Sequence, residues 1–189
     1  MREISESVLK EIRKLLCEKE SVIVAIDGRC ASGKTTLASL LGSTVDCNIV
    51  HADSFFLLPH QRTEERLSVP GENIEHERLL SEVLIPLKSG EPFSYRPFDC
   101  STMDFKEDVF IIPKKINIIE GSYCCHHSLL SFYDLTVFLS TDKEKQLQRI
   151  LERNGEASKK IFENKWIPLE EAYFEKYKLK DNTDLSFKT

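Results

Sequence analysis

The hydrophobic positions of the 189-residue chain fall into two kinds of pattern. Short apolar runs occupy residues 22–26, 47–52, 116–120 and 134–139, and their length and β-branched content predict buried strands. Elsewhere, as in residues 3–19, apolar residues recur at helical spacing among charged ones. Strands that alternate with helices predict an α/β fold of βαβ units, with a parallel sheet and helices on both faces.

Turn-forming residues mark the expected ends of further elements. The helix after residue 34 is expected to close at Gly42, and a helical stripe over about residues 73–90 is expected to be bent or shortened by Pro86. Pro168 suits the first turn of a last helix. Residues 184–187 are expected to add an edge strand.

The length fits a single domain over residues 1–189. Proline and glycine interrupt the periodicity between residues 54 and 113, so we expect an insertion there that leaves the sheet and holds a substrate. Thr141-x-x-Glu144 matches a capping box, and it opens a helix that Asn154-Gly155 is expected to end. We expect residues 142–165 to form a lid.

Charge and composition argue against nucleic acid and membrane partners. A formal charge of −5 and a pI near 5.6 argue against a duplex nucleic acid partner, which needs many cationic contacts to phosphate. The six cysteines follow neither a metal-site nor a paired C-x-x-C spacing, which is typical of free thiols in a reducing cytoplasm. No apolar run approaches the roughly 20 residues of a membrane span, so we expect no membrane association. A homo-oligomer is left open.

The most specific motif joins the first strand to the next helix. Gly28-x-x-x-x-Gly33-Lys34-Thr35 is a complete P-loop, in which backbone N–H groups and the helix dipole form a nest for a polyphosphate. Lys34 is expected to reach the β- and γ-phosphates of ATP, and the Thr35 hydroxyl to bind Mg²⁺. The predicted nucleotide-binding residues are Gly28, Arg29, Cys30, Ala31, Ser32, Gly33, Lys34, Thr35 and Thr36.

Two acidic residues follow strands that run parallel to the first. The carboxyl ends of such strands share one edge with the P-loop, which places Asp53 and Glu120 beside the phosphates. Asp53 is expected to accept the proton of an attacking hydroxyl and to contact Mg²⁺, and Glu120 stands where a Walker-B acid holds the hydrated ion. The plainer alternative for Asp53 is a turn or N-cap aspartate.

Further candidates lie on the lid and on the insertion. Arg149 and Arg153 are expected to neutralise the charge of the transferred phosphoryl group, unless they only form a solvated basic face. The insertion offers polar and aromatic residues that are expected to contact the phosphate acceptor. For each of these residues, the alternative is a purely structural or surface role. These candidates are Phe55, Phe56, Arg62, Arg66, His76, Tyr95, Arg96 and Asp99.

The ordered motifs resemble the uridine kinase family of P-loop kinases over roughly residues 20–155. The resemblance rests on the P-loop, Asp53-Ser54-Phe55-Phe56, Asn73-Ile74-Glu75-His76, Tyr95-Arg96-Pro97-Phe98-Asp99, Ile119-Glu120-Gly121 and the arginine-bearing helix. It implies a five-stranded parallel core and ATP·Mg²⁺-dependent phosphorylation of a nucleoside 5′-hydroxyl. It also implies that Asp53 is the catalytic acid–base, that Glu120 lies near Mg²⁺ and that Arg149 and Arg153 belong to the lid.

The chain departs from that family where the base would be read. Cys100-Ser101-Thr102-Met103 stands where the family has a Thr-His-Ser-Arg-like stretch, and the lid has Lys159-Lys160 in place of Arg-Gly-Arg. The leading hypothesis remains a small-molecule kinase, with the 5′-hydroxyl of uridine or cytidine as the acceptor that the resemblance implies, and these departures motivate an alternative acceptor. The same fold with another acceptor, such as pantothenate, a sugar phosphate or another nucleoside, is the alternative. A nucleotide-dependent switch is disfavoured, because Asn164-Lys165-Trp166-Ile167 lacks the aspartate that reads guanine.

Overall fold

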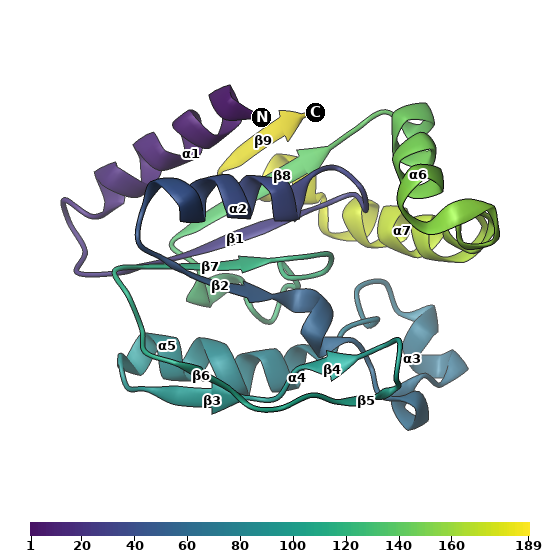
Figure 1. Ribbon diagram of the computed structural model, residues 1–189, viewed down its shortest axis with the longest axis horizontal. Coiled ribbons are helices and arrows are strands. Elements are labelled where there is room, and N and C mark those ends of the chain that lie inside the picture. Colours follow the sequence, from purple (N-terminus) through teal and green to yellow (C-terminus); the bar gives the residue numbers. More distant parts are fainter.

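A computed structural model describes all residues from 1 to 189, and its centre is a five-stranded parallel sheet (Figure 1). The strand order is β2-β7-β1-β8-β9. The strands are β1 (Val22–Gly28), β2 (Asn48–His51), β7 (Ile116–Glu120), β8 (Leu135–Ser140) and β9 (Leu185–Lys188). The predicted parallel sheet and its edge strand near the carboxyl terminus are confirmed.

The register of the sheet brings three strand ends together. β1 lies between β7 and β8, with Ile26 opposite both Glu120 and Val137. On the other side of β7, His51 at the end of β2 is also opposite Glu120. The chain that follows β1, β7 and β2 therefore leaves the sheet at the same edge, as the parallel arrangement requires.

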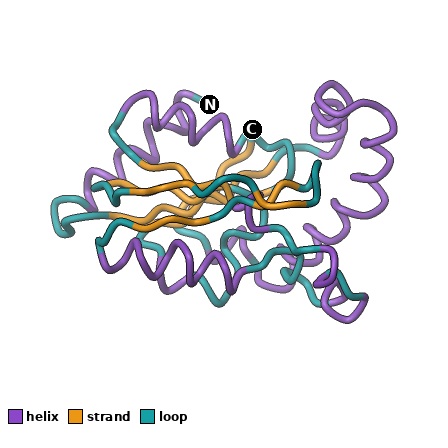
Figure 2. The backbone as a smooth tube through the Cα atoms, turned by 60° about the horizontal axis from the view of Figure 1, so that its bottom comes forward, coloured by secondary structure: helices purple, strands orange, loops and turns teal.

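Helices cover both faces of this sheet (Figures 1 and 2). On one face, α1 (Arg2–Leu15) and α2 (Lys34–Thr44) pack apolar residues such as Val8, Ile12 and Leu37 against β1 and β7. The other face packs against α7 (Ile167–Tyr177) and against a helix made of α4 (His76–Leu79), a π-helical turn (Leu80–Leu84) and α5 (Ile85–Ser89). The structure thus has the three layers of a P-loop fold.

The segment between residues 54 and 113 supplies much of that second layer. Its apolar residues, including Ile74, Leu79 and Val83, share one core with Ala25 and Ile119 of the sheet. The segment therefore packs directly on the sheet. Its remaining elements are α3 (Glu64–Ser68), the antiparallel pair β3 (Phe93–Tyr95) and β6 (Val109–Ile111), and the short pair β4 (Phe98–Asp99) and β5 (Asp104–Phe105).

Several predicted helix ends were wrong for local reasons. α2 continues through Gly42 to Thr44 because tertiary packing outweighs the low helix propensity of one glycine. Pro86 does not shorten its helix, which continues to Ser89, since the preceding π-helical turn accommodates a residue without an N–H.

The predicted capping box is also absent. Asp142 is the N-cap of α6 (Lys143–Ile161) and makes no side-chain cap, while the Thr141 hydroxyl donates to Thr189 O. Gly155 breaks the helical backbone as predicted, with φ 79° and ψ 173°, but the chain resumes helical geometry after it. A π-helical turn (Phe162–Trp166) then leads into α7, and α8 (Leu179–Asn182) precedes β9.

None of the helices combines the length and the apolar character needed to cross a bilayer.

Candidate active site

The P-loop closes tightly over the end of β1. Gly28 has φ 137°, and a Cβ at this position would lie 1.9 Å from Leu139 O, so only glycine fits. Gly33 adopts the left-handed conformation at the start of α2. The loop therefore curls back so that its amides and the amino end of α2 face the same side, as anion binding requires.

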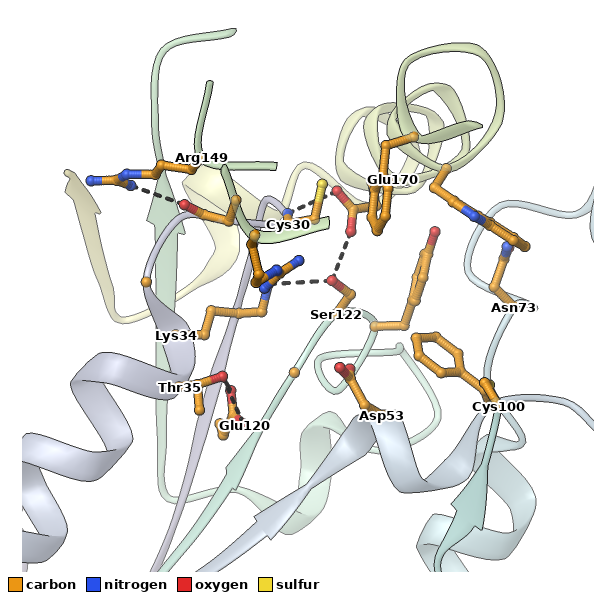
Figure 3. A pocket seen from close by; sticks show the side chains of 18 of the residues that line it. Cys30, Lys34, Thr35, Asp53, Asn73, Cys100, Glu120, Ser122, Arg149 and Glu170 are labelled. Atoms are coloured by element: carbon orange, nitrogen blue, oxygen red, sulfur yellow. Dashed lines mark hydrogen bonds between the residues drawn. The ribbon is translucent and has the colours of Figure 1, made fainter. Parts of the chain in front are cut away.

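Lys34 extends along the inside of this loop. Its Nζ is buried and donates to Gly28 O at 2.7 Å, to Arg29 O at 3.0 Å and to Ser122 Oγ at 3.2 Å (Figure 3). These neutral oxygens hold the ammonium group in place without cancelling its charge. The cation is thus kept beside the strand edge where the carboxylates lie.

Glu120 ends β7 next to the P-loop helix. The Thr35 hydroxyl lies 3.2 Å from each of its carboxylate oxygens, and His51 Nδ1 contacts Oε1. The hydrogen bond to Glu120 raises the pKa of His51 above its usual value. A hydroxyl and a carboxylate at this spacing are the hard oxygen ligands that Mg²⁺ prefers.

Asp53 follows β2 in a short 3₁₀ turn (Ala52–Phe55). Gly121 makes room for it, because a Cβ on that glycine would lie 2.8 Å from Ala52 Cβ and 3.1 Å from Asp53 Oδ1. The carboxylate is open to the cavity but enclosed by protein on its other sides, and this desolvation raises its pKa. Lys34 opposes the rise and Glu120 adds to it.

One cavity of about 940 Å³ joins these groups (Figure 3). Most of the predicted phosphate-handling side chains line it, so residues far apart in the chain meet in one space. The lining includes Cys30, Ala31, Gly33, Lys34, Thr35, Thr36, Asp53, Glu120, Arg149 and Arg153. The remaining P-loop residues, Gly28, Arg29 and Ser32, do not line the cavity.

The two predicted lid arginines occupy different settings. Arg149 Nη1 donates to Ala31 O at 2.9 Å and to Thr189 Oγ1 at 3.2 Å, so it is tied to the P-loop backbone. Arg153 also lines the cavity, and its nearest side-chain partner is the neighbouring Asn154 Oδ1 at 2.8 Å. Arg153 is therefore the more loosely held cation, and it is close enough to Asp53 to oppose the rise of the aspartate pKa.

The five acceptor contacts predicted most specifically do not line the cavity. Phe55 is fully buried and stacks on Tyr95 at 5.5 Å, because the 3₁₀ turn directs Phe55 into the core. His76 stacks on His126 at 4.1 Å, and the Arg96 guanidinium lies 4.4 Å from the centre of the Phe105 ring. Asp99 accepts hydrogen bonds from Ser101 and pairs with Lys106.

Other residues of the insertion and of the following helices take their place. Arg62, one of the weaker candidates, lines the cavity, whereas Arg66 binds backbone oxygens behind the wall. The cavity is further lined by Phe56, Leu57, Leu67, Asn73, Cys100, Tyr123, Phe162, Lys165 and Trp166. These lining residues are mainly apolar and aromatic, with a few polar groups.

Glu170 of α7 lines the cavity and contacts the P-loop, and the sequence analysis did not identify it as a candidate. Its Oε2 accepts the Cys30 N–H of the P-loop at 2.9 Å, and its Oε1 accepts the Ser122 hydroxyl at 2.7 Å. Beside it, Glu171 pairs with Arg29 at 2.8 Å. No local pattern marks Glu170, whereas Ser122 could have been noticed because it follows Glu120-Gly121.

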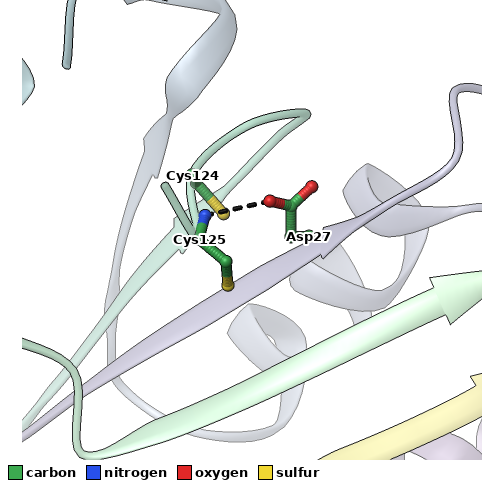
Figure 4. Close-up of side chains that lie close together, drawn as sticks. All are labelled: Asp27, Cys124 and Cys125. Carbon is green, nitrogen blue, oxygen red and sulfur yellow. Dashed lines mark hydrogen bonds between the residues drawn. The ribbon is translucent and has the colours of Figure 1, made fainter. Parts of the chain in front are cut away.

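Asp27 lies in β1 directly before the P-loop, and its side chain is close to Cys124 and Cys125 (Figure 4). Its two oxygens accept from the N–H groups of Gly28 at 2.6 Å, Tyr123 at 3.2 Å and Cys125 at 2.9 Å, and from the Tyr173 hydroxyl at 2.9 Å. Burial raises its pKa to about 6, against the opposing effects of Lys34 and these donors. Because four donors already use the carboxylate, its role is to join the P-loop to the chain after β7 and to α7.

The strand order and the phosphate-binding loop together define the P-loop fold. No protein-family model matches the chain. Among curated proteins the chain is similar to uridine-cytidine kinase-like 1 of Mus musculus, with 27% identity over 146 residues. It is also similar to a protein of Arabidopsis thaliana named uridine/cytidine kinase UKL1, chloroplastic, with 27% identity over 147 residues. Each match covers 72% of this chain but only 27% and 30% of the respective relative.

Solved structures agree on the fold. A possible uridine kinase from Bacillus stearothermophilus has a TM-score of 0.68 at 20% identity and covers 95% of this chain and 98% of its own. YFH7 of Saccharomyces cerevisiae, described as a candidate P-loop kinase with a circular permutation, has a TM-score of 0.70 at 13% identity over 98% and 99% of the two chains. The resemblance to the uridine kinase family and the predicted P-loop fold are confirmed.

Proposed function

We propose that this protein is an ATP- and Mg²⁺-dependent kinase that transfers a γ-phosphoryl group to a hydroxyl of a small molecule. The observation that carries the proposal is the convergence of Lys34, Thr35, Glu120 and Asp53 on one cavity. A phosphate-binding loop alone would serve any nucleotide-binding protein. A carboxylate that is open to the cavity beside the P-loop adds a base that can orient an acceptor hydroxyl and take up its proton.

The residues fit the nucleotide and the ion. The left-handed Gly33 at the start of α2 turns the loop so that the amino end of that helix faces the cavity, and Lys34 supplies a buried cation. Thr35 and Glu120 provide the hydroxyl and carboxylate oxygens that would hold Mg²⁺, with Asp53 close by. When bound, the ion supplies positive charge that neutralises the phosphate oxygens.

Each residue then has a defined part in the transfer. Lys34 binds phosphate oxygens, and Arg153, which lines the same cavity, offers a second cation. Asp53 orients the acceptor hydroxyl and takes up its proton, a task that its raised pKa favours. Arg149 positions the P-loop through Ala31 O, in addition to the charge that it contributes.

The acceptor proposed here is a nucleoside, with phosphate added to the 5′-hydroxyl of uridine or cytidine. The names of the curated relatives and the mainly apolar acceptor wall support this choice. Within the single domain of residues 1–189, residues 54–113 form the acceptor-binding insertion and residues 142–165 form the lid. The partner is then a small molecule, and the proposed compartment is the cytoplasm.

The direct test is a transfer assay. The protein is incubated with ATP, Mg²⁺ and a panel of nucleosides, pantothenate and sugar phosphates, and new phosphomonoesters are identified by mass spectrometry. We expect uridine or cytidine monophosphate from the parent protein. Asp53→Asn should lower the rate by roughly 10²- to 10⁴-fold, the usual contribution of a positioned general base.

Asp108→Asn is the matched control, because this exposed aspartate of the insertion lies away from the cavity. It should leave the rate unchanged. Parent-like turnover by Asp53→Asn would refute the assigned role of Asp53. ATP hydrolysis without a phosphorylated product from any acceptor would refute the kinase proposal. If only pantothenate or a sugar phosphate is phosphorylated, the kinase proposal stands and the nucleoside is refuted as the acceptor.

A further inference from the structure

Arg62 lines the cavity and has no carboxylate partner. Its Nε donates to Leu57 O at 2.9 Å, and its Nη2 lies 3.6 Å from Cys100 Sγ. Its Nη1 has no hydrogen-bond partner in the protein, and this atom is not buried, so a ligand can reach it. The residue as a whole is half-buried. Arg62 therefore presents a cationic group whose charge is not neutralised within the protein.

The other arginines of the insertion differ from Arg62. Arg66 and Arg78 each pair with a glutamate, at 2.9 Å and 2.8 Å respectively. Arg96 is exposed, and its guanidinium lies over an aromatic ring. None of these three side chains lines the cavity. Arg62 is thus the arginine that the insertion contributes to the cavity wall.

Arg62 lies on the acceptor side of Asp53. Leu57, whose carbonyl oxygen accepts from Arg62 Nε, is two residues beyond the 3₁₀ turn that carries Asp53. In the view of Figure 3, Asp53 lies between Lys34 and Cys100, and Cys100 is the side chain that Arg62 Nη2 contacts. Since Lys34 belongs to the phosphate-binding loop, Arg62 stands beyond Asp53 as seen from that loop.

We propose that Arg62 binds an anionic group, a carboxylate or a phosphate, on the acceptor. The inference rests on the proposed kinase function, and it adds alcohols that carry such a group to the neutral nucleosides as a second class of acceptor. A guanidinium can donate two parallel hydrogen bonds to a carboxylate or a phosphate, and these bonds are stronger than those between neutral groups. The bond from Nε to Leu57 O fixes the side chain and leaves the Nη groups for this contact.

The chemical step is the same for both classes of acceptor. The hydroxyl oxygen of the acceptor forms a bond to the γ-phosphorus of ATP, the bond from that phosphorus to the β–γ bridging oxygen breaks, and ADP leaves. Asp53 takes up the hydroxyl proton. Arg62 is a specificity-determining residue, because it fixes the charged end of the acceptor while the hydroxyl lies at Asp53.

The test measures binding, so that it does not depend on phosphoryl transfer. Calorimetry is done with Mg²⁺ and a non-hydrolysable ATP analogue, which occupies the phosphate-binding loop. Pantothenate is compared with panthenol, which lacks the carboxylate, and ribose 5-phosphate is compared with ribose. The parent protein should bind the anionic member of at least one pair roughly 10- to 100-fold more tightly, the usual effect of hydrogen bonds to a charged group. The pair that shows the preference identifies the anion.

Three variants separate recognition from a structural role. Arg62→Gln should lose the preference, so that the two members of the pair bind with similar affinity. Arg62→Lys keeps the charge without the planar fork and should keep only part of the preference. Arg96→Gln is the matched control, since Arg96 is an exposed arginine of the same insertion outside the cavity, and it should keep the full preference. A structural role for Arg62 predicts instead that Arg62→Gln lowers the melting temperature and weakens both members equally.

The inference is overturned if neither anionic ligand binds more tightly than its neutral counterpart, or if Arg62→Gln keeps the preference. It is also overturned if the transfer assay gives product from nucleosides alone, a result that would leave the kinase function in place. A preference that depends on Arg62, without a phosphorylated product from any acceptor, would support the anion contact and refute the kinase function. The failure of one proposal is thus distinguishable from the failure of the other.

Discussion

Carboxylates of the site differ in what surrounds them, and their roles differ accordingly. Asp27 is buried among four donors and joins segments of backbone. Glu170 accepts from one amide and one hydroxyl and holds the P-loop against α7. Asp53 faces the cavity and is free to accept from a substrate. Residue type alone cannot assign these roles, because they depend on which donors the fold brings near.

The contribution of Glu170 can be tested by a pair of substitutions. Glu170→Gln keeps an acceptor for the Cys30 N–H, and its new donor can bind the rotatable Ser122 hydroxyl, so stability should change little. Glu170→Met leaves the buried N–H unpaired and should cost about 1–3 kcal/mol of unfolding free energy. Urea denaturation measures both.

The control for this pair is Glu175→Met, since Glu175 is exposed on the same helix. Its effect should stay within about 0.5 kcal/mol. Equal losses for Glu170→Met and Glu175→Met would show that the contacts of Glu170 to the P-loop add no stability.

At the scale of elements, α7 connects the helix α6 to the edge of the sheet at the end of β1. Tyr173 on this helix is fully buried and donates to Asp27 at the end of β1. Phe174, the next residue, packs edge-on against Phe138 of β8 at 5.1 Å. The helix is therefore fixed to two strands, and the side chains that it carries into the cavity inherit that fixed position.

The hydrogen bond between α7 and β1 should be measurable on its own. Tyr173→Phe removes one donor from a buried carboxylate and should lower the unfolding free energy by about 1.5–3 kcal/mol, the range for bonds to charged groups. Tyr177→Phe on the same helix is the matched control and should cost far less. Chemical denaturation with both variants compares them, and equal midpoints would contradict this account of α7.

At the scale of the whole molecule, the sheet and its two helical layers leave one cavity at the carboxyl ends of the strands. The P-loop, the insertion and the helices after β8 all contribute to its wall. A ligand that fills this space contacts every layer, so it should stabilise the fold as a unit. Binding to the native state alone raises the free energy of unfolding by mass action.

ATP with Mg²⁺ should therefore raise the melting temperature. At 100 times the dissociation constant the gain is about 2.7 kcal/mol, or roughly 5–10 °C for a chain of this size. Lys34→Met should lose most of the gain, whereas Lys10→Met, at an exposed lysine of α1 that does not line the cavity, should keep it. Scanning fluorimetry with and without EDTA measures the shift, and an unchanged shift in Lys34→Met would contradict the assigned phosphate contact.

The sequence by itself determined the parallel α/β fold, the P-loop and the positions of Asp53 and Glu120. These features were predictable because each depends on a short contiguous pattern: an apolar strand, a glycine spacing, or an acid directly after a strand end. The tertiary structure alone decided that Phe56 and not Phe55 lines the cavity, and that Glu170 and Asn73 belong to it. Those outcomes depend on how a 3₁₀ turn and distant helices pack, and packing between segments far apart in the chain leaves no local signal in the sequence.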